Sequence, residues 1–193
     1  MTNAPAVAGL AGGTGLGYDA SGNMTSLNGE TLSWDAWGEM SGVAGTPSGN
    51  VSYAYDAFGR RMSKTVGSQT TYYLYDGDAL IAEVDASSGQ VIRSYTWGAN
   101  GLVSDRAGTQ SRFYLFDALG NARSLLDPNG NLLASAAYTA YGTPIGTPPP
   151  STPFGWQGQA GYTCDSTIAD FGHLFSDIIG KVEYNRCIRL QCV

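Results

Sequence analysis

The sequence predicts an all-β protein in which a meander of short antiparallel hairpins forms an open sheet, curved or spiral. One reason is the glycine content, since 27 of the 193 residues are glycine. A glycine inside a helix costs about 0.5–1 kcal/mol relative to alanine, so long helices are disfavoured. The 12 tyrosines, 6 phenylalanines and 4 tryptophans favour strands and are too many for a disordered chain. The third reason is a repeated turn motif.

The repeated motif is an aromatic residue followed by Asp, two variable residues and Gly. The aromatic residue ends a strand, the Asp accepts backbone N–H hydrogen bonds, and the Gly adopts the positive φ that closes the turn. The four full copies are Tyr18-Asp19 to Gly22, Trp34-Asp35 to Gly38, Tyr55-Asp56 to Gly59, and Phe116-Asp117 to Gly120. Related turns are predicted at Tyr75-Asp76-Gly77, Trp97-Gly98, Asp127-Pro128-Asn129-Gly130 and Tyr141-Gly142. We expect these residues to have structural roles.

Aromatic pairs at positions i and i+2 form a second repeat. The pairs begin 20, 22 and 19 residues apart, at Tyr53/Tyr55, Tyr73/Tyr75, Tyr95/Trp97 and Tyr114/Phe116. Because residues two apart lie on the same face of a strand, each pair predicts one buried aromatic edge. Burying a large apolar side chain contributes roughly 1.5–3 kcal/mol, which favours a core role for these rings over sugar binding.

Composition divides the chain into four parts, a flexible segment at 1–17, the repeat region at 18–142, a Pro-rich linker at 143–153 and a C-terminal part at 154–193. The linker contains five of the eight prolines and is predicted to be extended and semi-rigid. In the C-terminal part, an aromatic strand is predicted at 154–159, and apolar residues at helical spacing predict an amphipathic helix at about 166–179.

The charge pattern excludes several classes of protein. Ten basic residues against sixteen acidic ones give a net charge of −6, which argues against a nucleic-acid or anionic-membrane partner. No run of about 18 apolar residues predicts a membrane span. The segment Met1–Gly17 has no Lys or Arg before its apolar residues, so a secretory signal is not predicted there.

The residues that could carry chemistry are few. Cys164, Cys187, Cys192 and His173 could be combined into a zinc set, but their spacing fits no tight zinc knuckle. A disulfide between Cys187 and Cys192, or three free thiols, is favoured, and no motif activates a Cys–His nucleophile pair. The glycine-rich segment at 12–17 lacks the Lys and preceding strand of a phosphate loop. We therefore expect no catalytic residue, no metal and no cofactor.

Three segments resemble YD repeats: Tyr-Asp-Ala-Phe-Gly-Arg-Arg at 55–61, Tyr-Leu-Phe-Asp-Ala-Leu-Gly-Asn-Ala-Arg-Ser-Leu-Leu-Asp at 114–127, and Ala-Ala-Tyr-Thr-Ala-Tyr-Gly at 136–142. The last two, with Pro-Phe-Gly-Trp-Gln-Gly-Gln at 153–159, resemble the start of the RHS-repeat-associated core of bacterial Rhs proteins. This resemblance implies a β-sheet spiral that winds into a hollow shell around a polymorphic C-terminal toxin. It also implies secretion or a cell-surface location, and toxin cargo or neighbouring shell repeats as partners.

The sequence departs from that family after Gly161-Tyr162. The family core continues to a closing Asp-Pro-x-Gly motif with self-cleaving aspartates, and neither can be placed in this chain. Residues 163–193 are therefore interpreted as a diverged, recombined or frameshifted end.

The leading hypothesis is a non-catalytic structural piece of an Rhs/YD-repeat shell. Its open sheet edges could pair with another chain. One alternative is a cell-surface adhesion or carbohydrate-binding module that uses Trp34 or Trp37 to bind glycans. Another makes residues 163–193 the stub of a toxin effector.

Overall fold

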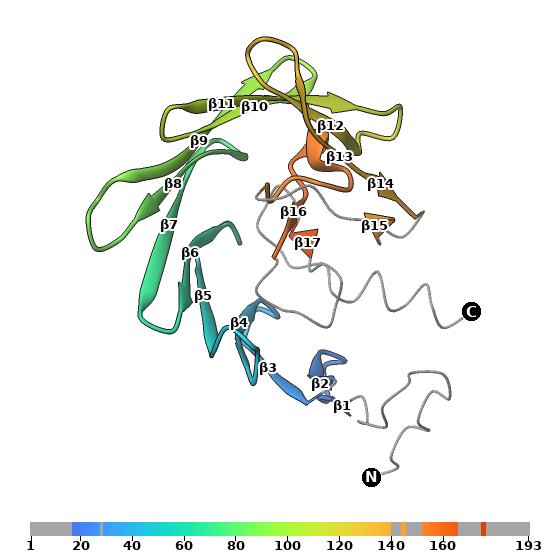
Figure 1. Cartoon of the computed structure of the whole chain (residues 1–193). Coiled ribbons are helices and arrows are strands. Elements are labelled where there is room, and N and C mark those ends of the chain that lie inside the picture. The colour runs from blue at the N-terminus through green and yellow to red at the C-terminus, as the bar shows by residue number, and fades with distance from the viewer. Residues whose placement is uncertain (1–16, 28, 140–143, 146–151, 166–174, 177–193) are drawn as a thin grey trace.

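A single curved antiparallel sheet dominates the computed structural model, which describes residues 17–27, 29–139, 144–145, 152–165 and 175–176. Thirteen strands follow one another in chain order, and each is paired with its neighbours in the sequence, so that β1 and β13 form the two edges. Figure 1 shows the sheet bending into an arc, with the chain after β13 turning into its hollow side. The predicted all-β, open and curved meander is confirmed.

The sheet strands are β1 (Gly17–Tyr18), β2 (Met24–Leu27), β3 (Glu30–Trp34), β4 (Met40–Ala44), β5 (Val51–Tyr55), β6 (Arg61–Val66), β7 (Gln69–Asp76), β8 (Ala79–Asp85), β9 (Val91–Gly98), β10 (Gly101–Ala107), β11 (Gln110–Phe116), β12 (Ala122–Leu126) and β13 (Leu132–Ser135). Beyond the sheet are β14 (Ala137–Tyr138), β15 (Pro144–Ile145), the 3₁₀ turn η1 (Gly158–Ala160), β16 (Thr163–Cys164) and β17 (Phe175–Ser176). β14 pairs with β15, and β16 pairs with β17.

Each full copy of the turn motif connects an odd-numbered strand to the next even-numbered one. In the β5–β6 turn, Oδ1 of Asp56 accepts hydrogen bonds from the backbone N–H groups of Phe58 and Arg60, at 2.9 and 3.0 Å. Gly59 closes the turn with a φ of 80°. The strand register shifts by one residue just before Tyr55, which leaves a β-bulge beside the turn. A bulge bends its strand, so recurrence of this unit along the sheet accounts for part of the curvature.

The same geometry recurs at Asp19, Asp35, Asp117 and Asp127, where the carboxylate accepts backbone N–H groups two and four residues on. The β7–β8 turn is tighter, because Asp76 pairs directly with Ala79.

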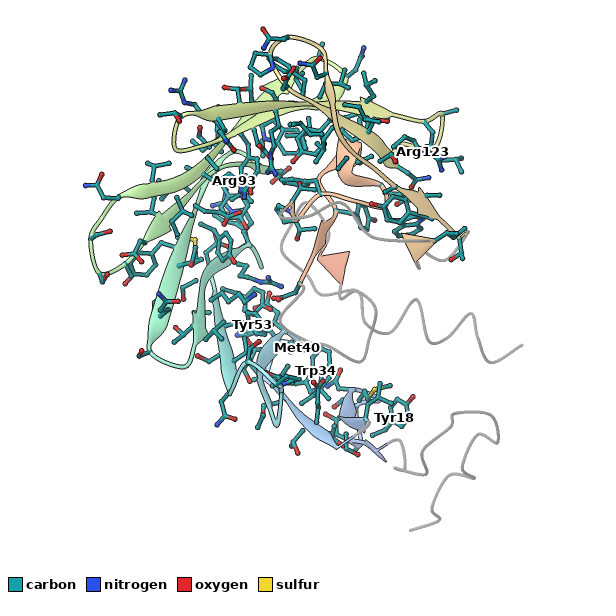
Figure 2. The ribbon with its side chains drawn as sticks, viewed as in Figure 1. Tyr18, Trp34, Met40, Tyr53, Arg93 and Arg123 are labelled. Carbon is teal, nitrogen blue, oxygen red and sulfur yellow. The ribbon has the colours of Figure 1, made fainter. Side chains whose placement is uncertain are left out.

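The core lies on the hollow side of the sheet and has two parts. The first contains Met24, Leu27, Leu32, Met40, Val43, Val51 and Tyr53, from β2 to β5. The second contains Leu80, Tyr95, Leu102, Tyr114, Ala122, Leu125 and Phe154, from β8 to β12 and the segment after β15. Figure 2 shows Met40 and Tyr53 on the hollow side of the arc. The hollow side is therefore filled by side chains.

Some predicted segments have a different structure or lie outside the described residues. The strand predicted at 154–159 is wrong, because Phe154 makes an isolated bridge to Thr163 and the chain then enters η1. In the predicted linker, Pro144–Ile145 form a strand. The helix predicted at 166–179 lies outside the described residues except for Phe175–Ser176, which form a strand and no helix. Of the flexible segment predicted at 1–17, only Gly17 is described.

The turn glycines provide a test of backbone strain without steric overlap. Gly38 has a φ of +78°, and an added Cβ would meet nothing within 4 Å. Replacing it with Ala is expected to lower the free energy of unfolding by about 1–2 kcal/mol, the cost of a left-handed conformation for a residue with a Cβ. Urea unfolding of Gly38→Ala measures this loss. The control is Gly38→Asn, whose side chain tolerates this conformation, and an equal loss in both variants would contradict the explanation.

Asp85, in the β8–β9 turn, provides a test of the turn electrostatics. Its pKa is lowered from 3.8 to about 2, first by the Ser87 hydroxyl and then by the backbone N–H of Ser88. A lowered folded-state pKa means that the carboxylate stabilises the fold above the unfolded-state value, and this contribution disappears as pH falls through the folded value. An NMR titration of the Asp85 carboxyl carbon should therefore have its midpoint near 2. A midpoint near 3.8 would show that these hydrogen bonds do not persist in solution.

Candidate functional site: the concave face

Tyrosine and tryptophan rings line the concave face of the sheet. Tyr53, Tyr95 and Tyr114 are buried, and the second ring of each of their pairs is half-buried against the same core. Tyr73 and Tyr75 are also half-buried there. The prediction of a buried aromatic edge is thus confirmed for three pairs, whereas both rings of the Tyr73/Tyr75 pair are half-buried.

The polar tips of these rings have defined partners. The indole Nε1 of Trp34 donates to the Met24 carbonyl at 2.6 Å, and that of Trp97 donates to the Leu80 carbonyl at 2.7 Å. The Tyr95 hydroxyl donates to the Glu83 carboxylate. Each of these bonds joins a ring to a neighbouring part of the sheet, so the aromatic layer is held by hydrogen bonds as well as by packing.

A segment from Thr152 to Asp165, called here the return segment, crosses the concave face. Figure 1 shows it in orange to red within the hollow of the arc. Its anchor is Phe154, whose side chain is 0% exposed. The Phe154 ring meets Tyr95 and Trp97 edge-on, with 5.0 and 5.8 Å between ring centroids. The return segment therefore completes the second part of the core.

Backbone contacts fix the return segment to the β11–β12 turn. The Ala122 N–H donates to the Gly155 carbonyl at 2.9 Å, and the Gln159 N–H donates to the Gly120 carbonyl at 3.1 Å. The approach is close: a Cβ on Gly101 would lie 2.2 Å from the Gln159 carbonyl oxygen. Only glycine at position 101 permits this packing.

A buried carboxylate, Asp105 on β10, organises the basic residues around it. Arg93 and Arg112 bind it at 3.1 and 2.7 Å, and the Tyr114 hydroxyl donates to it at 2.5 Å. Burial raises the pKa of Asp105, and the Tyr114 hydrogen bond and the Arg93 charge oppose that rise. Tyr114 also shares a hydrogen bond with the Thr152 hydroxyl. The ion-pair network of the sheet thereby reaches the start of the return segment.

A second buried carboxylate, Asp165, lies at the other end of the return segment. The Lys64 ammonium is 2.5 Å from its Oδ1, and Arg61 is 3.4 Å from its Oδ2. The Tyr53 hydroxyl donates to Oδ2 at 2.9 Å. These contacts join the end of the return segment to β5 and β6, in the first half of the sheet.

The motif residues singled out in the sequence do not converge on one site. Because neighbouring strands of a meander are antiparallel, the turns after odd-numbered strands all lie at the same end of the strands. The turn aspartates therefore form a row there, which contains Asp19, Asp35, Asp56, Asp76 and Asp117. Successive turns are two strands apart, about 10 Å. Asp127 follows β12 and lies at the opposite end of the strands. The Asp and Gly residues of the motif form the turns, whereas its aromatic residues Trp34, Tyr55, Tyr75 and Phe116 pack on the concave face.

The charged residues of the concave face were missed in the sequence because they belong to no motif. The alternation of strand side chains could have found two of them, since Arg93 lies two residues before Tyr95, Arg112 lies two residues before Tyr114, and each shares the face of its tyrosine. The partner Asp105 pairs with Tyr95 across the β9–β10 register, which no local pattern reveals.

The favoured Cys187–Cys192 disulfide or free thiols, and the disfavoured zinc set, are not tested by the described residues. His173, Cys187 and Cys192 lie outside the described residues. Among the residues that are described, no group of three or more metal-ligating side chains comes together. No helix in that part of the chain is long and apolar enough to cross a membrane. The concave face presents aromatic packing and neutralised ion pairs.

The fold and its concave aromatic layer define a wall segment of a β-sheet shell. The family model of the teneurin YD-shell matches residues 10–162, so the chain belongs to the YD-shell family. It is similar to the tRNA3(Ser)-specific nuclease WapA of Bacillus spizizenii, with 37% identity over 137 residues. That match covers 68% of this chain and 6% of the relative. A probable deoxyribonuclease, RhsB of Dickeya dadantii, is 32% identical over 109 residues, covering 51% of this chain and 8% of the relative.

Solved toxin structures share the fold. The crystal structure of TcdB2-TccC3 superposes with a TM-score of 0.57 at 20% identity, covering 84% of this chain and 9% of that one. The Tc holotoxin pore of Photorhabdus luminescens gives a TM-score of 0.56 at 17% identity, covering 85% of this chain and 10% of that one. The chain thus spans about a tenth or less of the length of these relatives. The expectation of an RHS/YD-repeat protein is confirmed.

The anchoring role of Phe154 leads to a matched pair of variants. Phe154→Ala removes a fully buried ring and is expected to lower the free energy of unfolding by about 3–5 kcal/mol. Phe113→Ala is the control, because Phe113 alternates with Tyr114 on β11 and its side chain is 40% exposed. Its loss should be much smaller. Equal losses in urea unfolding would show that the return segment does not contribute to the core.

Proposed function

We propose that this chain forms part of the wall of an Rhs-type shell that encloses a C-terminal toxin, and that this part of the wall is not catalytic. The observation that carries the proposal is the path of the chain after β13. It turns into the hollow of the arc, crosses the concave face as the return segment, and reaches β6 at Asp165. Polypeptide that follows Asp165 therefore starts from the concave side of the wall.

The chemistry of the concave face supports a wall. Asp105 and Asp165 are each bound by two basic side chains and a tyrosine hydroxyl. A catalytic carboxylate or tyrosine needs an open side from which substrate can approach. Here the carboxylates, the basic side chains and the tyrosine hydroxyls are hydrogen-bonded to one another. Burial also raises the pKa of Tyr53 and of Tyr114, which keeps both phenols neutral. Neutral, packed tyrosines suit a rigid lining.

The relatives also support a separation between the shell wall and the part of the chain that is catalytic. Two are named as nucleases, yet this chain matches only 6% of one and 8% of the other. The matched part has the shell fold. We infer that nuclease chemistry in those proteins lies in other parts of their chains, and that the matched stretch holds the shell together.

The two alternatives gain no specific support. Trp34 packs against the first part of the core and donates its indole N–H to Met24, so it is not free to stack on a glycan. Trp37 is 87% exposed at the β3–β4 turn. Of the segment 163–193 considered as an effector stub, residues 163–165 belong to the return segment, and Phe175–Ser176 are the only others described.

A direct assay tests the non-catalytic role. The purified chain, incubated with labelled tRNA and with plasmid DNA, is expected to cleave neither, because its concave carboxylates are fully engaged. The WapA protein of Bacillus subtilis, which is 36% identical over 137 residues and is named a tRNA nuclease, serves as the positive control. Cleavage by this chain that disappears on substituting Asp105 or Asp165 would overturn the proposal.

A chimera tests the wall role. The stretch of Bacillus subtilis WapA that matches this chain is replaced by the matching residues of this chain. The chimera is expected to keep its tRNA nuclease activity and the protease resistance of the parent, because one wall segment replaces another. The same chimera with Phe154→Ala, which opens the core, should lose protease resistance first. A chimera whose resistance does not depend on Phe154 would count against a wall that shields its contents.

A further inference from the structure

Asp165 occupies a position that the rest of the return segment does not require. Its contacts with Lys64, Arg61 and Tyr53 span 101, 104 and 112 residues of sequence. The carboxylate is buried, with 2% of the side chain exposed. The remainder of the segment is already anchored on β9 to β12 by Phe154 and by backbone hydrogen bonds. The Asp165 contacts are therefore a separate attachment to the first half of the sheet.

The groups that bind Asp165 are arranged by the sheet itself. Tyr53 on β5 pairs with Lys64 on β6 across the strand register. Arg61 lies on the same strand as Lys64, and its guanidinium carbon sits 4.5 Å from the centre of the Tyr53 ring, a cation–π contact. The Tyr75 hydroxyl holds the Arg61 backbone carbonyl at 3.1 Å. Two cations and one hydroxyl donor are thus positioned by residues that belong to the sheet.

Charge explains why this arrangement calls for a carboxylate. The side chains of Arg61 and Lys64 are 9% and 15% exposed. Buried cations without a counter-ion are strongly destabilising, and the Asp165 carboxylate provides one negative charge that both cations contact. Charge-assisted hydrogen bonds to a carboxylate are also about twice as strong as neutral ones.

The other buried carboxylate makes the contrast clear. Asp105 is part of β10 and sits between Arg93 and Arg112 of the neighbouring strands, so its network is internal to the sheet. Asp165 comes from a segment outside the sheet. The cations of the first network pair with a carboxylate of the sheet itself, and those of the second pair with a carboxylate of the return segment.

We propose that Arg61, Lys64 and Tyr53 form a carboxylate-binding site on the concave face, which captures the acidic side chain of a crossing segment and is occupied here by Asp165. The site determines where the end of the return segment attaches to the first half of the sheet. It recognises the carboxylate group, so a carboxylate supplied from solution can occupy it when Asp165 is removed. The proposal holds whether or not the sheet encloses a cargo.

Chemical rescue tests the site in the full chain. Asp165→Ala leaves the two cations unpaired and is expected to lower the thermal unfolding midpoint. It should also accelerate amide hydrogen exchange at 162–165 by about tenfold or more, because a local attachment is lost. Sodium acetate should raise the midpoint again along a saturable curve, relative to sodium chloride of equal ionic strength. Acetamide, which has the same shape without the charge, should not.

Two further variants make the test specific. Asp127→Ala removes a turn carboxylate that accepts only hydrogen-bond donors of its own turn, so acetate should not restore its loss beyond the chloride control. Adding Lys64→Met to Asp165→Ala should abolish the acetate effect. Asp165→Asn, which keeps the side-chain volume, serves for the exchange measurement if the alanine variant does not fold.

The proposal is overturned by either of two results. One is hydrogen exchange at 162–165 in the Asp165 variant that equals that of the original chain. The other is a response to acetate that matches chloride, or that persists after Lys64→Met. A saturable acetate response that requires Lys64 supports it.

Discussion

The structure depends on one constraint, which is that a single curved sheet must exclude water from the apolar side chains of its concave face. In the described part of the chain, most of the large buried side chains lie on that face. Tyrosine and tryptophan suit this face, because each ring buries a large apolar area and carries a polar group that can hydrogen-bond to a neighbouring strand. Phe154 completes the layer from outside the sheet. Removing it would expose rings that other strands have already buried.

The curvature and the aromatic layer support each other. In the turn at Asp56, the carboxylate accepts hydrogen bonds from the backbone N–H groups of the turn, and a β-bulge lies beside Tyr55. The bulge bends the strand. The bend brings distant strands toward a common hollow, where one crossing segment can contact both halves of the sheet. This is why the return segment reaches β12 at Gly155 and β6 at Asp165.

Membership of the YD-shell family fits this physical picture. A sheet whose strands pair only with their chain neighbours can be extended by further repeats without changing the packing of earlier ones. Relatives several times as long as this chain are consistent with that principle. The charged groups of the concave face form ion pairs within the wall. This is consistent with our proposal that chemistry is carried out by other parts of such proteins.

The sequence by itself determined the meander, the turns that carry the motif and the buried side of the strands that carry aromatic pairs, because these depend on local rules. The Asp56 turn needs only a carboxylate and a glycine three residues later, and Tyr53 and Tyr55 share a face through strand alternation. Only the tertiary structure decided the path of the return segment. Phe154 was predicted in a strand and instead inserts between Tyr95 and Trp97. The pairing of Asp165 with Lys64 spans 101 residues, and no local pattern carries such information. Its energy is the balance between the cost of removing the charged groups from water and the attraction of charges that meet only once the sheet has curved.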